Sequence, residues 1–257
     1  MEYLRPIESV LGFLTILPVG KQNHDLYYVA KSMYLFPAAG LVIGAIIGAM
    51  AFGVSNFLHP MLVGFLVAGA LIIITGVHHT DALTDFADGL MAKGSRESKH
   101  RAMRDPAAGS AGVAALVMYF AGMIIVFNIG FESSLAIFTS LITAEVIAKY
   151  VMVMLAYRGL SAWEGSSSPF TVVMKDKTRM LAATGIMVTI VGFASSYAGF
   201  AALVVSLLLA ELLKYVSRKS FGGISGDVLG ASNEITRLSS LIVLSSLSST
   251  PLVIMVF

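Results

Sequence analysis

The chain alternates long apolar runs with short polar segments, a pattern that predicts membrane-spanning helices. About seven runs approach or reach the roughly 20 apolar residues that a helix needs to cross a bilayer. Glycine, proline or a cluster of polar residues separates them. The predicted spans are 34–57, 61–78, 109–131, 134–156, 180–197, 200–216 and 238–257. The pattern therefore predicts an all-α, polytopic membrane helical bundle.

A shorter apolar piece, residues 10–19, precedes the first predicted span. It is too short to cross a bilayer, so we expect an interfacial or re-entrant helix. No internal repeat and no low-complexity tract divides the chain. We therefore expect residues 1–257 to form a single transmembrane catalytic domain.

Composition supports this class, since 57% of the residues are hydrophobic and only 12% are charged, against about 25% in ordinary soluble domains. The chain has no cysteine, which excludes disulfides, thiolate metal sites and cysteine nucleophiles. The net charge of +2 says little by itself, and we expect no nucleic-acid partner.

The positions of lysine and arginine predict an orientation. They lie in the N-terminal segment and in three polar loops: 81–108, 157–179 and 217–237. The alternate loops contain none: 57–60, 130–133 and 197–199. We therefore expect a multi-pass protein of the cell membrane with its N-terminus and polar loops in the cytoplasm and its C-terminus outside. Charge confined to one side also weighs against a transporter, whose ionisable groups should be reachable from both sides.

An acidic stripe begins where the second predicted span ends, and it is compatible with a continuation of that helix. Asp81, Asp85 and Asp88 are spaced i, i+4 and i+7, which places them within an arc of roughly 60° on a helix. Three like charges on one face repel each other, and Mg²⁺, which takes carboxylate oxygens, would reverse that cost. A solvated polar face is the alternative.

Arg104 and Asp105 close the same polar segment. Arginine can hold a phosphate through two hydrogen bonds, and Asp105 could add a metal ligand or fix the arginine. Sites of phosphoryl transfer typically combine acids that hold Mg²⁺ with a basic residue that neutralises the remaining charge of the phosphate. The alternative for the basic residues here, Arg104 included, is contact with anionic lipid headgroups.

The segment 221–237, FGGISGDVLGASNEITR, lies in the predicted cytoplasmic loop 217–237. Backbone N–H groups at Gly223 and Gly226 could approach phosphates. Asp227 and Glu234 are seven residues apart and would share a helix face, and Asn233 adds a neutral donor and acceptor. We expect this segment to form the second half of one site with the acidic stripe.

Four ionisable residues lie inside predicted spans, as the pairs Glu145/Lys149 and Glu211/Lys214. Both structural pairing and a place in a substrate cavity stay open for them. Gly40, Gly44 and Gly48 suit close helix packing, within the chain or in a homo-oligomer. Trp163 is expected to be an interfacial anchor.

From about residue 11 to about residue 237 the chain resembles the cobalamin synthase family, the adenosylcobinamide-GDP ribazoletransferases. The motifs that carry the resemblance occur in order: Phe13-Leu14-Thr15, Phe36-Pro37, His79-x-Asp81-x-x-x-Asp85-x-x-Asp88-Gly89, Met103-Arg104-Asp105, and Gly222-Gly223-x-x-Gly226-Asp227-x-x-Gly230 followed by Asn233 and Glu234. One departure is Ala82, where the family usually has glycine.

The resemblance implies a Mg²⁺-dependent membrane enzyme that joins adenosylcobinamide-GDP to α-ribazole, or its 5′-phosphate, and releases GMP. On this hypothesis Mg²⁺ is held by a set of five acids: Asp81, Asp85, Asp88, Asp227 and Glu234. Catalysis falls to Asp88, Asp105 and Arg104. Substrate contacts come from five residues: Arg104, Gly223, Gly226, Asn233 and His79.

Two other functions stay open at this stage. A CDP-alcohol phosphotransferase has a related aspartate motif, but it needs Asp-Gly-x-x-Ala-Arg, which the chain does not supply after Asp88. A cation or corrinoid transporter is the alternative from outside the enzymes.

Overall fold

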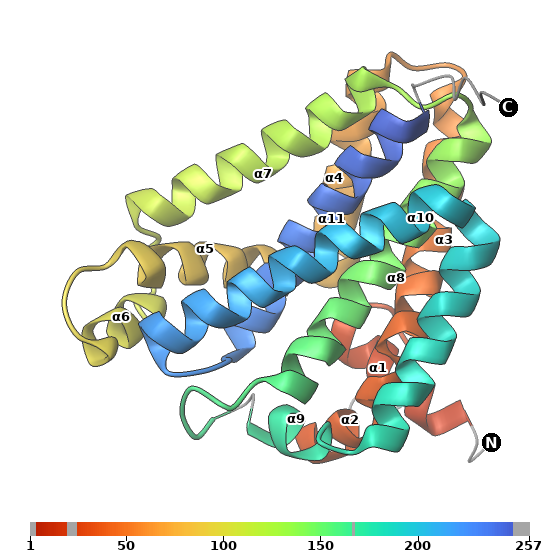
Figure 1. The fold of residues 1–257 in the computed structure, drawn as a ribbon. Helices are drawn as coiled ribbons and strands as arrows, with labels where there is room; N and C mark the ends of the chain where they lie inside the picture. The colour runs from red at the N-terminus through yellow and green to blue at the C-terminus, as the bar shows by residue number, and fades with distance from the viewer. Residues whose placement is uncertain (1–3, 20–24, 166–167, 249–257) are drawn as a thin grey trace, which may run out of the picture.

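The computed structural model describes residues 4–19, 25–165 and 168–248, and these are all-α, as predicted (Figure 1). No strand occurs among them beyond an isolated bridge between Ser161 and Ile224. The helices are α1 (Arg5–Leu14), α2 (Leu26–Ser32), the 3₁₀ turn η2 (Met33–Leu35), α3 (Phe36–Ser55), α4 (Pro60–Thr75), α5 (His78–Met91), α6 (Arg96–Met103), α7 (Ser110–Ile129), α8 (Ser134–Arg158), α9 (Ser168–Val173), α10 (Lys177–Phe221) and α11 (Gly226–Ser248).

Helix α8 forms the centre of the bundle, with α3, α10 and α11 packed around it (Figure 1). Every residue of 140–156 is buried. Helix α3 comes close because Gly40 and Gly44 lack side chains: a Cβ atom there would lie 2.7 Å from the Glu145 carbonyl oxygen and 2.6 Å from the Ile142 Cα, respectively. These glycines therefore pack within the chain, and they supply no argument for a homo-oligomer.

Within the described residues, four helices are long and apolar enough to cross a membrane: Leu26–Ser55, α7, α8 and α10. A fifth is counted if α4 and α5 form one broken span. The predicted number of seven is therefore not confirmed. The fifth and sixth predicted spans correspond to the two arms of α10, two helical stretches that meet at a non-helical residue, Ser196 (φ 45°, ψ −128°), next to the predicted loop 197–199. Much of the seventh predicted span falls outside the described residues.

The acidic stripe does not continue the second predicted span. Gly76 and Val77 both have positive φ, 63° and 61°, and α5 leaves at 96° to α4. Glycine adopts this conformation freely, whereas a β-branched valine is strained in it. Helix α5 has 14 residues, about 21 Å at 1.5 Å per residue, too short to cross a bilayer core. The stripe therefore lies on a separate short helix that is sharply bent from α4 and packed against α11.

The predicted second cytoplasmic loop, 217–237, is mostly helical. Helix α10 continues to Phe221 and α11 begins at Gly226, so only 222–225 connects them. The loop prediction was wrong because the polar residues that suggested a loop, Glu234 and Arg237 among them, are buried and paired inside the bundle.

The apolar piece 10–19 forms the second half of α1 and the chain after it. The helix starts earlier than predicted, at Arg5, and ends at Leu14. Val10 and Leu14 are buried against the bundle, so α1 packs as part of the fold.

Loops predicted to share a membrane side contact each other. The Arg179 guanidinium donates to the Lys31 carbonyl oxygen at 2.7 Å, which joins two predicted cytoplasmic segments. At the other end, the Ser134 hydroxyl donates to the Asn56 side-chain oxygen at 3.0 Å, which joins the span ends next to two predicted outer loops, 57–60 and 130–133. The alternation of the loops therefore agrees with the fold.

Cations of the predicted cytoplasmic loops cap helix C-termini. The Lys99 ammonium donates to the carbonyl oxygens of Leu90 and Ala92, both at 2.6 Å, at the end of α5. Lys175 donates to Gly159 at 2.6 Å at the end of α8. Carbonyls left unpaired at a helix end carry partial negative charge, so these lysines stabilise the helices that hold the polar loops in place.

Candidate active site

Helix α5 presents the predicted aspartates beside the start of α11. Ala82 and Phe86 are buried on one face of α5, whereas Asp81 is exposed and Asp85 is half-buried. The two helices approach closely at Gly230, where a Cβ atom would lie only 2.4 Å from the Ala82 Cβ. This contact brings the carboxylates of α5 next to the N-terminal turn of α11.

The first turn of α11 adds a third carboxylate, Asp227. The Ser225 hydroxyl accepts the Val228 N–H at 3.2 Å and caps this turn. Burial, followed by the charges of Asp81, Asp227 and Asp88, raises the pKa of Asp85 to about 6. Burial also raises the pKa of Asp227, and the Asp81 charge adds to it. Carboxylates from the two helices therefore repel each other at close range.

This arrangement fits a hard divalent cation by the chemistry of its donors. Carboxylate oxygens are ligands that Mg²⁺ prefers, and Mg²⁺ commonly completes its shell with substrate phosphate oxygens and water. Among the described residues, no group of three or more His, Asp or Glu side chains is arranged to hold a metal ion by itself. The mutual repulsion of Asp81, Asp85 and Asp227 is what a cation with substrate ligands would relieve.

Asp88 lies differently from the other acids of the stripe. Its two carboxylate oxygens accept the backbone N–H groups of Gly109, at 2.7 Å, and Gly112, at 2.8 Å. A Cβ atom at Gly109 or Gly112 would lie within 2.5 Å of this carboxylate. Asp88 thus caps the N-terminus of α7 and anchors it to α5, a role that the predictions of metal ligand and base did not include.

Arg104 and Asp105 are both exposed after the end of α6. The Asp105 carboxylate accepts the Ala107 N–H at 3.0 Å, and with Asp88 it lines a hollow of about 280 Å³. His100 lies in the fields of Arg104 and Asp227: burial and the Arg104 charge lower the pKa of His100, and the Asp227 charge raises it. The structure therefore brings Arg104 to the side of the site where Asp227 lies.

Asn233 and Glu234 lie in a buried charged cluster, one to two turns deeper along α11 than Asp227. Arg237 pairs with Glu234 and with Glu145 of α8, and its guanidinium also donates to the Tyr119 hydroxyl at 2.9 Å. Lys149 of α8 donates to the Asn233 side-chain oxygen at 2.7 Å. Two carboxylates thus face two cations, which is the structural pairing left open for Glu145 and Lys149.

These bonds bear on three predicted site residues, Glu234, Asn233 and His79. One Glu234 oxygen accepts from Arg237 and the other from the Asn233 amide, so neither is directed to the carboxylates of α5. The His79 Nδ1 lies 3.4 Å from the same amide nitrogen. The geometry therefore does not support Glu234 as a metal ligand or Asn233 as a substrate contact, whereas His79 also lines a pocket.

Gly223 and Gly226 have different surroundings. Gly223 is buried where the chain crosses residues 160–162, and a Cβ atom there would lie 2.4 Å from the Leu160 carbonyl oxygen. Its lack of a side chain serves this crossing, which Ile224 completes with an N–H···O bond of 2.7 Å to Leu160. Gly226 is exposed and lines the same pocket as His79, as the predicted substrate role requires.

The sequence did not predict the stacking of His100 on Trp163. The rings of His100 and Trp163 stack with centroids 3.7 Å apart, so Trp163 joins the loop 159–165 to α6. The His100 Nε2 atom is buried without a hydrogen-bond partner among the described residues. No local signal relates the two residues, because they are 63 positions apart.

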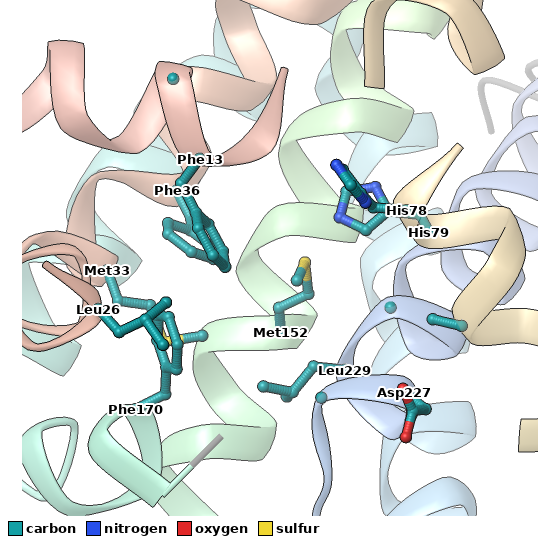
Figure 2. A pocket seen from close by; sticks show the side chains of 14 residues that line it. Phe13, Leu26, Met33, Phe36, His78, His79, Met152, Phe170, Asp227 and Leu229 are labelled. Atoms are coloured by element: carbon teal, nitrogen blue, oxygen red, sulfur yellow. The ribbon is translucent and has the colours of Figure 1, made fainter. Parts of the chain in front are cut away.

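A pocket of about 430 Å³ opens beside Asp227 (Figure 2). Phe13, Phe36 and Phe170 form one wall, with ring centroids 5.5 to 6.4 Å apart. His78, His79 and Asp227 lie across from them in Figure 2. The pocket is therefore aromatic on one side and polar on the side of the carboxylates.

Comparison with known proteins assigns this chain to a family. The family model described as cobalamin-5-phosphate synthase matches residues 7–245. The chain belongs to the cobalamin-5-phosphate synthase family. The family is one of enzymes, which decides against a transporter among the alternatives.

Curated relatives of this cobalamin-5-phosphate synthase family member are named adenosylcobinamide-GDP ribazoletransferase. The protein of Methanocella arvoryzae is 32% identical, over 93% of this chain and 94% of its own length. That of Archaeoglobus fulgidus is 32% identical over 93% and 96%, and that of Methanosarcina barkeri is 34% identical over 95% and 93%. No solved structure matches the chain.

The departure at Ala82 from the cobalamin-5-phosphate synthase motif has a packing explanation. The Ala82 methyl group faces Gly230, and a second methyl group at position 230 would not fit. The contact therefore holds one small side chain, that of Ala82. The close approach of α5 and α11 is thereby kept.

Proposed function

We propose that this enzyme joins adenosylcobinamide-GDP to α-ribazole, or to its 5′-phosphate, to form adenosylcobalamin, or its 5′-phosphate, with release of GMP. The names of the relatives support the donor and the acceptor. The observation in this chain that carries the proposal is the meeting of α5 and α11, where the charges of Asp81 and Asp227 act on Asp85. Acids grouped in this way suit a phosphorylated substrate bound with Mg²⁺.

In this reaction a ribazole hydroxyl oxygen forms a bond to the phosphorus that carries cobinamide, and the bond from that phosphorus to the GMP oxygen breaks. Bound Mg²⁺ would neutralise the pyrophosphate and stabilise the charge that develops on GMP. Asp81, Asp85 and Asp227 are the residues that would hold it. Arg104, exposed on the same side, would bind the leaving phosphate.

The hydroxyl proton must pass to a base. Both carboxylate oxygens of Asp88 accept backbone N–H groups, so we now assign this residue to positioning α7 against α5. Asp105 is exposed and keeps the predicted role of base.

We also propose that the enzyme lies in the cell membrane with this site on the cytoplasmic side. The positive-inside distribution supports this, because the carboxylates and the basic loops share one end of the bundle. The donor carries a nucleotide and the acceptor is a nucleoside or its 5′-phosphate, and both are soluble molecules that reach that side directly.

The test supplies purified protein in liposomes with adenosylcobinamide-GDP, α-ribazole and Mg²⁺, and measures GMP and cobalamin together. Asp85→Asn should lower kcat by at least about a hundredfold, because it removes a charge needed against the pyrophosphate. Glu132→Gln, an exposed acid at the other end of the bundle, is the matched control and should keep full activity. No turnover by the wild type, or full turnover by Asp85→Asn, would refute the proposal.

A further inference from the structure

The aromatic pocket beside Asp227 has no role in the reaction as described so far. Phe36 and Phe170 are almost fully buried in its wall and Met33 is fully buried, while Leu26 is 36% exposed. The wall is built by the N-terminal segments α1, α2, η2 and α3 together with α9, which lies more than a hundred residues further along the chain (Figure 2). These segments therefore converge to give one apolar surface at the edge of a charged site.

We infer that this pocket binds the acceptor nucleoside, with its planar aromatic base against Phe13, the partly buried ring that Phe36 and Phe170 support from behind. The inference rests on the proposed function and deepens it, since it gives the acceptor its own subsite. A flat base offers its faces to phenyl rings, and such stacking is favourable without depending on a particular pattern of hydrogen bonds.

The size of the cavity distinguishes the two substrates. Its volume is about 430 Å³, near the lower end of the range of pockets that hold drug-sized ligands. A nucleoside falls within that size. A corrinoid carrying a nucleotide is several times larger and cannot enter, so the donor must lie outside the pocket.

The polarity of the cavity orients the nucleoside. Asp227 and His78 lie across from the phenyl rings, and Asp227 belongs to the carboxylate group of α5 and α11 (Figure 2). With the base on the aromatic wall, the ribose faces Asp227. Its hydroxyl groups then point to where the phosphorus of the donor would be held, as attack requires.

The test measures the binding of labelled α-ribazole to the full-length protein by equilibrium dialysis without the donor, and the KM of both substrates. Phe13→Leu and Phe170→Leu remove an aromatic face and keep an apolar side chain. Each should raise the Kd and KM of α-ribazole by roughly tenfold and leave the KM of adenosylcobinamide-GDP unchanged. Phe193→Leu, at a ring 91% exposed on α10, is the matched control and should change neither.

An unchanged Kd and KM of α-ribazole in both pocket variants would overturn the assignment. So would an equal rise in the KM of both substrates at unchanged thermal stability, because the pocket would then serve the site as a whole. A wild-type protein that binds α-ribazole through Phe13 but makes no cobalamin would keep the pocket and refute the reaction. If the enzyme turns over and the KM of α-ribazole is the same in the pocket variants as in the wild type, the pocket assignment is refuted and the proposed reaction stands.

Discussion

Replacing Arg237 by methionine tests whether the buried charged cluster holds the bundle together. Arg237 is only 1% exposed and pairs with Glu145 and Glu234. Methionine has a similar length and no charge, so the change leaves two buried carboxylates with Lys149 as the cation between them. One negative charge is then uncompensated inside the protein.

The expected cost follows from that charge. Removing one partner of a buried ion pair typically destabilises a protein by about 3–5 kcal/mol. For a chain of about this size, each kcal/mol corresponds to roughly 2–4 °C in Tm, so Tm should fall by about 6–20 °C. Arg218→Met, an exposed arginine near the end of α10, should shift Tm by less than about 2 °C.

The assay is thermal unfolding of purified protein in detergent, followed by light scattering and by loss of the monodisperse peak in gel filtration. Adding Glu234→Gln to Arg237→Met restores charge balance and should recover most of the lost Tm. The reasoning is wrong if Arg237→Met unfolds like the wild type. It is also wrong if the double variant is less stable than the single one, because charge balance would then not be the cause.

Two further outcomes follow from the packing of α3 and from the acids of α5. Gly44→Ala should lower the free energy of unfolding by about 1–3 kcal/mol, because its Cβ would lie 2.6 Å from the Ile142 Cα. The control Gly69→Ala, in open space on α4, should leave stability unchanged or raise it slightly. Equal Tm values for the two variants would contradict the packing argument. The pKa of Asp85 is raised from 3.8 to about 6, so between these values the folded state holds a proton that the unfolded state releases. The Tm of metal-free protein should therefore fall between about pH 4 and pH 6 and level off above. Asp85→Asn should flatten this part of the Tm profile, and an unaltered profile in that variant would contradict the assignment to Asp85.

The helices that cross the bundle were readable from the sequence because their signals are local. The apolar runs predicted at 109–131 and 134–156 correspond to α7 and α8 within a few residues. The glycines of α3 marked a close contact correctly, but not the partner, which lies about a hundred residues further along the chain. Periodicity indicates that a face packs and does not say against what.

The errors fall where polar residues have distant partners. Glu234 and Arg237 look like loop residues in the sequence, and only the contact with Glu145 of α8 shows why they are buried. The role of Asp88 also depends on a distant segment, since the N–H groups that it accepts belong to Gly109 and Gly112. The acids of α5 were found as a group, but their spacing did not show that Asp88 caps another helix.

The charged cluster and the candidate active site are two ends of one helix face. Asp227, Gly230, Glu234 and Arg237 follow each other at intervals of three or four residues along α11, so they point in nearly the same direction. Arg237 fixes the register of this face against α8, and Gly230 fixes it against Ala82 of α5. A slip of α11 by one residue would turn the face by about 100° and separate Asp227 from Asp81. The segment first predicted as a glycine-rich loop is therefore a helix with a fixed register, and the buried ion pairs hold its carboxylate, Asp227, beside the acids of α5.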